Sequence, residues 1–121
     1  MNSKQLKDRT KKFAIEIVNL AETFPKTNTG FVIGKQLIRS ATSVGANYRS
    51  ACRAKSKKDF INKIAIVEEE ADETLYWLEI ALELQLGDHD KIKILLEEAN
   101  QLTAIFTSSK ITASGATKDE R

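Results

Sequence analysis

The residues of this chain whose types and spacing best suit a chemical role are cations, and the chemistry that they suit is the binding of phosphate groups. Five of them fall within the segment RSACRAKSKK, from Arg49 to Lys58. Clustered lysines and arginines attract a polyanion because binding releases the counterions condensed on its phosphates. The candidate nucleic-acid contacts are Lys11, Lys12, Arg49, Arg53, Lys55, Lys57, Lys58 and Lys63.

Residue patterns typical of catalysis or metal binding do not occur in the sequence. His89 is the one histidine and falls in an expected turn, which favours a capping or surface role. Cys52 is the one cysteine and has no histidine base, so we interpret it as a packing residue. The acidic run over residues 68–73 wraps around a helix instead of converging, which favours a solvated face over a cation site. We predict no catalytic residue, no metal site and no cofactor.

Long helices are the elements that must position the cations. The chain has 121 residues, of which 41% are hydrophobic and 30% charged, with five glycines and one proline. So few helix breakers favour one all-α domain over a sheet protein. Neither an apolar stretch of about 18 residues nor a secretory leader is recognisable, so we expect a cytoplasmic protein without a membrane segment.

Apolar residues recur at helical spacing in four segments, over about residues 3–24, 31–55, 57–86 and 89–107. Pro25 is expected to end the first helix, Ser56 to cap the third and Gly87 to end it. Short connections between four helices predict an antiparallel up-down-up-down four-helix bundle. The bundle is predicted to cover residues 1–107, followed by a flexible, disordered tail over residues 108–121.

The second helix shows two neighbouring stripes. Its apolar stripe spans about 80° and contains Ile33, Leu37, Ala41, Val44, Tyr48 and Ala51. Beside it lies a stripe of small and amide side chains, namely Gln36, Ser40, Ser43, Asn47, Ser50 and Ala54. Small side chains allow another helix to approach closely, and buried polar groups then require specific hydrogen bonds.

Charge is expected to divide between the two ends of the bundle. The topology places the N-terminus, the corner between the second and third helices and the C-terminus at one end. Fourteen of the 19 lysines and arginines fall there against four acids, a net charge of +10, which leaves −8 elsewhere. Such polarisation focuses a field on a polyanion, although a solvated, solubilising end is the alternative. Tyr48, the nearby aromatic residue, is expected to point inward, which favours backbone contacts over base stacking.

The third helix carries a second apolar face besides its core stripe, although a bundle helix needs only one stripe. Either this face forms a subunit interface, which we favour because tryptophan is a typical anchor there, or Trp77 covers a broad core. Glu70 and Glu73 border the face and are expected to pair with a basic residue of a neighbouring subunit, such as Arg39. The predicted oligomer interface contains Arg39, Ile66, Glu70, Glu73, Trp77, Ile80 and Leu84.

Three motifs carry a resemblance to a known family: QLxRSAxSVxAN from Gln36 to Asn47, KDF over residues 58–60, and EAxETxxWL from Glu70 to Leu78. They closely resemble the bacterial four-helix-bundle family that includes proteins encoded in intervening sequences of 23S ribosomal RNA genes. The resemblance implies a non-enzymatic bundle that forms a ring-like homopentamer. A distant relative, the accessory variability determinant of diversity-generating retroelements, is a basic pentamer that binds nucleic acid and a reverse transcriptase. The chain departs from the family near Ser50, where many members carry glutamate.

Charge and resemblance together predict a homo-oligomeric, nucleic-acid-binding accessory protein that prefers RNA and uses its basic end. Its expected partners are further copies of itself and RNA or DNA, with no membrane. The alternative is a protein-interaction scaffold that binds a protein partner through its second apolar face or its acidic surface and has no nucleic-acid ligand. An enzyme is the third class and has the least support, because no acid–base or metal constellation is present.

Overall fold

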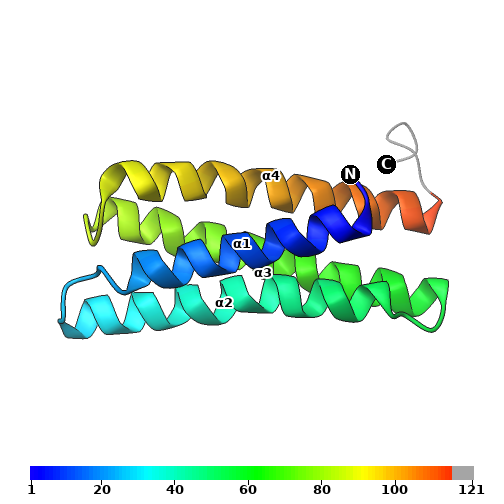
Figure 1. Ribbon diagram of the computed structural model, residues 1–121, viewed down its shortest axis with the longest axis horizontal. Helices are drawn as coiled ribbons and strands as arrows, with labels where there is room; N and C mark the ends of the chain where they lie inside the picture. The colour runs from blue at the N-terminus through cyan, green and yellow to red at the C-terminus, as the bar shows by residue number, and fades with distance from the viewer. Residues whose placement is uncertain (116–121) are drawn as a thin grey trace.

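The computed structural model describes residues 1–115, which form four helices (Figure 1). They are α1 (Ser3–Ala21), α2 (Asn28–Cys52), α3 (Lys57–Glu83) and α4 (His89–Ser114). Successive helices run in opposite directions, which confirms the predicted up-down-up-down bundle. In Figure 1 the N-terminus, the α2–α3 turn and the end of α4 lie at one end of the long axis, and the other two connections lie at the opposite end.

An apolar core runs along the bundle and explains why these segments are helical. All six residues of the predicted apolar stripe on α2 are buried. The predicted core residues of α4 are buried as well, namely Ile92, Leu95, Ala99, Leu102 and Phe106. Burying an amphipathic face supplies most of the stability of such helices. The helical phase of these segments was therefore predicted correctly.

Side-chain caps set where the helices begin. Ser56 caps α3 as predicted, because its hydroxyl accepts the Asp59 backbone N–H at 3.0 Å. The second helix begins three residues before the predicted Phe31, because the Thr27 hydroxyl accepts the Gly30 N–H at 3.1 Å and starts α2 at residue 28. It also ends three residues early, at Cys52, so the turn into α3 is longer than predicted.

The end of α3 differs from the prediction. Gln85 adopts a left-handed φ of 54°, and its N–H donates to the Leu82 carbonyl at 3.1 Å. The Leu86 N–H donates to the Ala81 carbonyl, also at 3.1 Å, which completes a Schellman motif. The prediction that Gly87 ends this helix was wrong, because Gln85 takes the left-handed position that glycine usually occupies.

The fourth helix extends to Ser114, seven residues beyond the predicted end at residue 107. A cross-helix anchor explains the difference: Lys110 Nζ donates to Glu68 Oε1 on α3 at 2.6 Å, and Thr107 donates to the same carboxylate. The tail was predicted from the polar composition of residues 108–121, and composition alone does not indicate a contact with a distant residue such as Glu68. Residues 116–121 of the predicted tail lie outside the described residues.

The seam between α2 and α3 contains two fully buried hydroxyl groups. Thr74 Oγ1 donates to Ser40 Oγ at 2.9 Å, and the Ser40 hydroxyl donates to the Gln36 carbonyl at 3.0 Å. The predicted small-residue stripe therefore provides a close helix contact with a specific hydrogen bond, as expected for this residue pattern.

The seam between α1 and α4 is less extensive, because α1 packs mainly against α2. Arg9 joins the two helices: its Nε and Nη2 each donate to the Glu98 carboxylate at 2.7 Å, and Nη2 also donates to Gln101 at 2.8 Å. A bidentate arginine–carboxylate pair of this kind is strong and geometrically specific. A polar clamp therefore secures the part of α1 that faces α4.

The first two turns of α2 allow a test of the packing around two glycines. A Cβ atom at residue 30 would overlap the Pro25 carbonyl oxygen, whereas a Cβ atom at residue 34 would lie 3.6 Å from the Ala21 Cβ, an ordinary contact. We expect Gly30→Ala to lower the free energy of unfolding by about 1–3 kcal/mol and Gly34→Ala to raise it by up to about 1 kcal/mol. Urea unfolding at one protein concentration measures both changes. Equal effects of the two substitutions would contradict this explanation.

The anchor of α4 predicts a dependence on pH. Burial alone would raise the pKa of Glu68, but the hydrogen bonds from Lys110 and Thr107 outweigh burial and lower it. A carboxyl group whose pKa falls on folding contributes stability above its unfolded pKa. That contribution is lost as the pH falls through the lower, folded pKa.

We therefore expect Glu68→Gln to reduce hydrogen-exchange protection of residues 108–114 about fivefold at neutral pH, as for the loss of about 1 kcal/mol. The native chain should lose the same protection below the folded pKa of Glu68. Glu69→Gln is the matched control, because Glu69 is exposed and forms no ion pair within residues 1–115. Unchanged protection in Glu68→Gln would show that other contacts hold this end of α4.

Candidate nucleic-acid interface

The turn between α2 and α3 presents four cations, Arg53, Lys55, Lys57 and Lys58, which we call the corner cations. All four are exposed. None of them forms an ion pair with another residue of the described chain. Arg53 and Lys55 lie in the turn, and Lys57 and Lys58 are the first two residues of α3, so all four lie at one end of the bundle (Figure 1).

Asp59 is the acid closest in sequence to the corner cations. Its carboxylate accepts the Lys55 backbone N–H at 3.1 Å and pairs with Lys63 Nζ at 3.1 Å. The hydrogen bond from the Lys55 backbone, together with Lys63, lowers the pKa of Asp59, which is therefore ionised at neutral pH. Lys63, a predicted nucleic-acid contact, is thus already paired with an acid of its own helix.

The two predicted contacts on α1, Lys11 and Lys12, differ in their surroundings. Lys12 lies 3.8 Å from Glu16 one turn along the helix, and the pair is largely exposed. Lys11 is exposed and, together with Lys7 and Arg49, lines a groove between α1 and α2. We call this hollow, of about 440 Å³, the α1–α2 groove; its other lining residues are Thr10, Ala14, Thr42, Gly45 and Ala46.

Lys7 was not among the predicted contacts, although the structure places it with Lys11 and Arg49. Lys7 and Lys11 are four residues apart, so the sequence alone puts them on one face of a helix. That Arg49 faces them depends on how α1 and α2 are aligned, which helical periodicity does not determine.

Ion pairs make the cationic surface narrower than the charge count predicted. Within residues 1–115, acids pair with five cations assigned to the basic end, namely Lys4, Arg9, Lys12, Lys63 and Lys110. Seven cations of this end form no ion pair in the described chain: Lys7, Lys11, Arg49, Arg53, Lys55, Lys57 and Lys58. The remaining charges assigned to this end, at residues 118–121, lie outside the described residues.

Arg39 of the predicted oligomer interface finds its partners inside the same chain. Its guanidinium pairs with Glu70 at 3.1 Å and also with Glu73, across the seam from α2 to α3. Trp77 Nε1 donates to Glu73 at 3.2 Å. Glu70 and Glu73 thus find Arg39 within their own chain, and their pairing with a basic residue of a neighbouring subunit stays a prediction.

The second apolar face of α3 is only partly open. Trp77 and Ile80 are half-buried against their own core, whereas Ile66 is 43% and Leu84 52% exposed. Tyr76 was not predicted to belong to this face, yet it is 54% exposed and packs edge-on against Trp77 with ring centroids 5.0 Å apart. The proposed interface role of this face stays a prediction.

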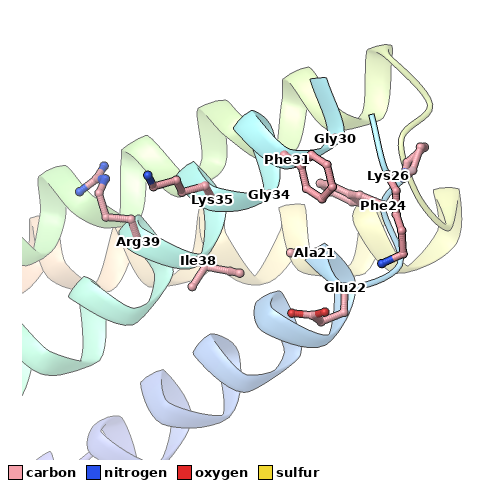
Figure 2. A pocket seen from close by; sticks show the side chains of 11 residues that line it. Ala21, Glu22, Phe24, Lys26, Gly30, Phe31, Gly34, Lys35, Ile38 and Arg39 are labelled. Atoms are coloured by element: carbon pink, nitrogen blue, oxygen red, sulfur yellow. The ribbon is translucent and has the colours of Figure 1, made fainter. Parts of the chain in front are cut away.

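An apolar pocket lies at the opposite end of the bundle, where α1 leads into α2 (Figure 2). Its volume is about 430 Å³, and Phe24, Phe31 and Ile38 are among the residues that line it. Figure 2 shows Lys35 and Arg39 along one side of the pocket. No sequence pattern predicted this pocket, since it depends on how the α1–α2 connection folds back.

Groups suited to catalysis are not brought together in the described part of the chain. Residues 1–115 contain no group of three or more His, Cys, Asp or Glu side chains arranged to hold a metal ion. Tyr48 is buried, as predicted, and burial together with its hydrogen bond to Cys52 raises the pKa of its hydroxyl. None of the helices described combines the length and apolar character needed to cross a membrane.

Comparison with known proteins gives a match over most of the bundle. A family model described as 23S rRNA-intervening sequence protein matches residues 3–108. The chain is also similar to the crystal structure of a protein with unknown function from the S23 ribosomal protein family of Bacteroides thetaiotaomicron VPI-5482. The two are 35% identical with a TM-score of 0.82, over 91% of this chain and 98% of the other. No match was found among curated proteins.

Proposed function

We propose that this chain, which belongs to the 23S rRNA-intervening sequence protein family, is a non-enzymatic cytoplasmic protein that binds nucleic acid, preferably RNA, through its basic end. The observation that carries the proposal is the group of seven cations without ion pairs in the described chain. The family description names a ribosomal RNA, which makes structured RNA the first ligand to test.

The basic end suits contacts to phosphates better than contacts to bases. Tyr48 is buried, and Phe60, near the start of α3, is packed against the core. Stacking of bases requires accessible aromatic rings, which these two side chains do not provide. The corner cations would then bind the backbone with little dependence on sequence, and binding would weaken steeply as salt is added.

Charge reversal at the corner tests the proposal. We expect Lys57→Glu with Lys58→Glu to weaken binding of a structured RNA at least tenfold at low salt. The slope of log affinity against log salt should fall by about 0.7–0.9 for each phosphate that the variant no longer binds. The fold should persist, because glutamate is favoured in the first turn of a helix. Gel retardation and a salt titration measure the two effects.

Lys91→Glu with Lys93→Glu is the matched control, because both lysines are exposed near the start of α4 at the opposite end. It makes the same change in net charge at the same kind of helix position. An equal reduction in both variants would assign the effect to net charge. Failure of the native protein to retard structured RNA or duplex DNA at low salt would reject nucleic-acid binding.

Self-association is the second part of the proposal: the chain forms a homo-oligomer, a pentamer by resemblance to its family, through the α3 face. Ile66, Tyr76 and Leu84 leave apolar surface exposed there. Burying such side chains contributes about 25 cal/mol per Å² before the costs of association. In an oligomer the basic ends would act together and raise the avidity for a long polyanion.

We expect Leu84→Glu to dissociate the oligomer while leaving each chain helical. Leu84 is 52% exposed, so replacing it lowers the free energy of unfolding of the monomer only slightly. Trp77→Ala should also weaken association, with some loss of monomer stability because Trp77 packs on the core. Light scattering at micromolar concentration measures the mass. Ile94→Glu on α4 is the control, at 65% exposure outside the predicted interface. A monomeric native protein would contradict the proposal.

The apolar pocket favours a second candidate function, that of a protein-interaction scaffold without a nucleic-acid ligand. Two cations that form no ion pair within residues 1–115, Lys26 and Lys35, are among its lining residues, together with Arg39, which is paired with Glu70 and Glu73, and one acid, Glu22. These features suit a partner that presents an apolar side chain next to acidic residues. Purification of one protein partner, combined with no binding to structured RNA, would favour the scaffold over the nucleic-acid proposal.

A further inference from the structure

We propose that the α1–α2 groove seats the sugar–phosphate backbone of an RNA strand, with Lys7, Lys11 and Arg49 binding its phosphates. This inference rests on the proposed function. It goes further because it places a strand between two helices along the side of the bundle, whereas the predicted contacts lie mostly at the corner.

The shape of the groove comes from small residues on both helices. Ala14 on α1 and Gly45 and Ala46 on α2 line it. A Cβ atom at residue 45 would lie only 3.3 Å from Thr10 Oγ1, so α1 and α2 approach each other closely at this point. Short side chains between longer ones leave a hollow of about 440 Å³ whose lining includes three cations.

The charge of the groove is of one sign. None of the residues that line it is acidic. The acids of α1 next to it in sequence are engaged elsewhere, since Asp8 pairs with Lys4 at 3.1 Å and Glu16 lies 3.8 Å from Lys12. Lys7, Lys11 and Arg49 therefore have no acidic partner within residues 1–115.

A second hollow, on the side of α1 that faces α4, shows that a lining without acids is not a general property of the surface. Arg9 and Lys12 line that hollow, which lies against α4, but Glu16, Glu97 and Glu98 line it too. Its arginine is held by a bidentate pair with Glu98. A polyanion would meet neutralised or opposing charge on that flank, whereas the α1–α2 groove offers cations alone.

The spacing of the cations fits a nucleic-acid strand. Lys7 and Lys11 are four residues apart, or about 6 Å along the helix axis. One strand of duplex DNA places a phosphate about every 3.4 Å along its axis, so the two lysines span roughly two phosphate steps of such a strand, and slightly more of the shorter-rise RNA helix. Arg49 lies one helical turn before Arg53 on α2, which makes the groove continuous with the corner cations.

Filling the groove without changing charge tests the inference. Ala46→Leu places a larger apolar side chain at an exposed position in the groove wall. We expect it to weaken binding of a labelled RNA hairpin about tenfold at low salt. Ala104→Leu, at an exposed position on α4 that does not line the groove, should bind like the native protein. Circular dichroism and thermal melting establish that both variants are folded.

Arg49→Gln provides a second measurement that does not depend on filling the groove. It should weaken binding and lower the slope of log affinity against log salt by about 0.7–0.9, the value for one phosphate contact. Polyglutamate at equal charge concentration should compete weakly with the hairpin, because the inference requires phosphate groups rather than carboxylates.

Two outcomes would overturn the inference. Native-like binding by both Ala46→Leu and Arg49→Gln, with binding abolished in the corner variant Lys57→Glu, Lys58→Glu, would reject the groove and leave the proposed function standing. Competition by polyglutamate as strong as that by unlabelled RNA would reject a phosphate-specific groove. No binding by the native chain at low salt would instead reject the proposed function itself.

Discussion

The contact between α2 and α3 is the constraint on which the rest of the bundle depends. A purely apolar seam would tolerate sliding by one helical turn, whereas the bond from Thr74 to Ser40 exists in one alignment only. Arg39 adjoins Ser40 on α2. On α3, Glu73 adjoins Thr74 and Glu70 lies one turn before it, so the pairs of Arg39 with these two acids favour the same alignment. A buried hydrogen bond such as that from Thr74 to Ser40 selects one register among several of similar burial. With α2 and α3 held in this alignment, the turn that joins them and the first residues of α3 present the corner cations at one end of the bundle.

The fold divides the cations of the basic end into those that pair with acids and those that form no ion pair within the described residues. Arg9 and Lys110 join helices that are far apart in sequence, so their charge serves packing. The seven cations of the basic end that form no ion pair within residues 1–115 lie on α1, on α2 and at the corner between α2 and α3. A cation paired with an acid adds little net charge to the field that attracts a polyanion. A binding surface is therefore defined by the absence of local acids as much as by the presence of lysines.

The sequence predicted correctly those features that depend on residues close together in the chain. Helical periodicity predicted the buried stripes of α2 and α4, and Ser56 was recognised as a cap. Contacts between distant residues could not be read in the same way: Glu68 lengthens α4 by binding Lys110, 42 residues away. The same limit applies to the candidate site, because the meeting of Lys7 with Arg49 depends on the alignment of two helices. The apolar pocket was missed because it arises from a connection rather than from a periodic element.

The uneven packing of α1 has a consequence for how the bundle opens. This helix packs mainly against α2, and the Arg9 clamp accounts for the polar part of its seam with α4. Regions with fewer buried contacts open at lower free energy than the whole domain unfolds. Of the four helices, α1 therefore has the lowest cost of release, and its release would allow the α1 of a second copy to take its place. Because α1 also forms one wall of the α1–α2 groove, a strand bound there would oppose this exchange of helices between copies.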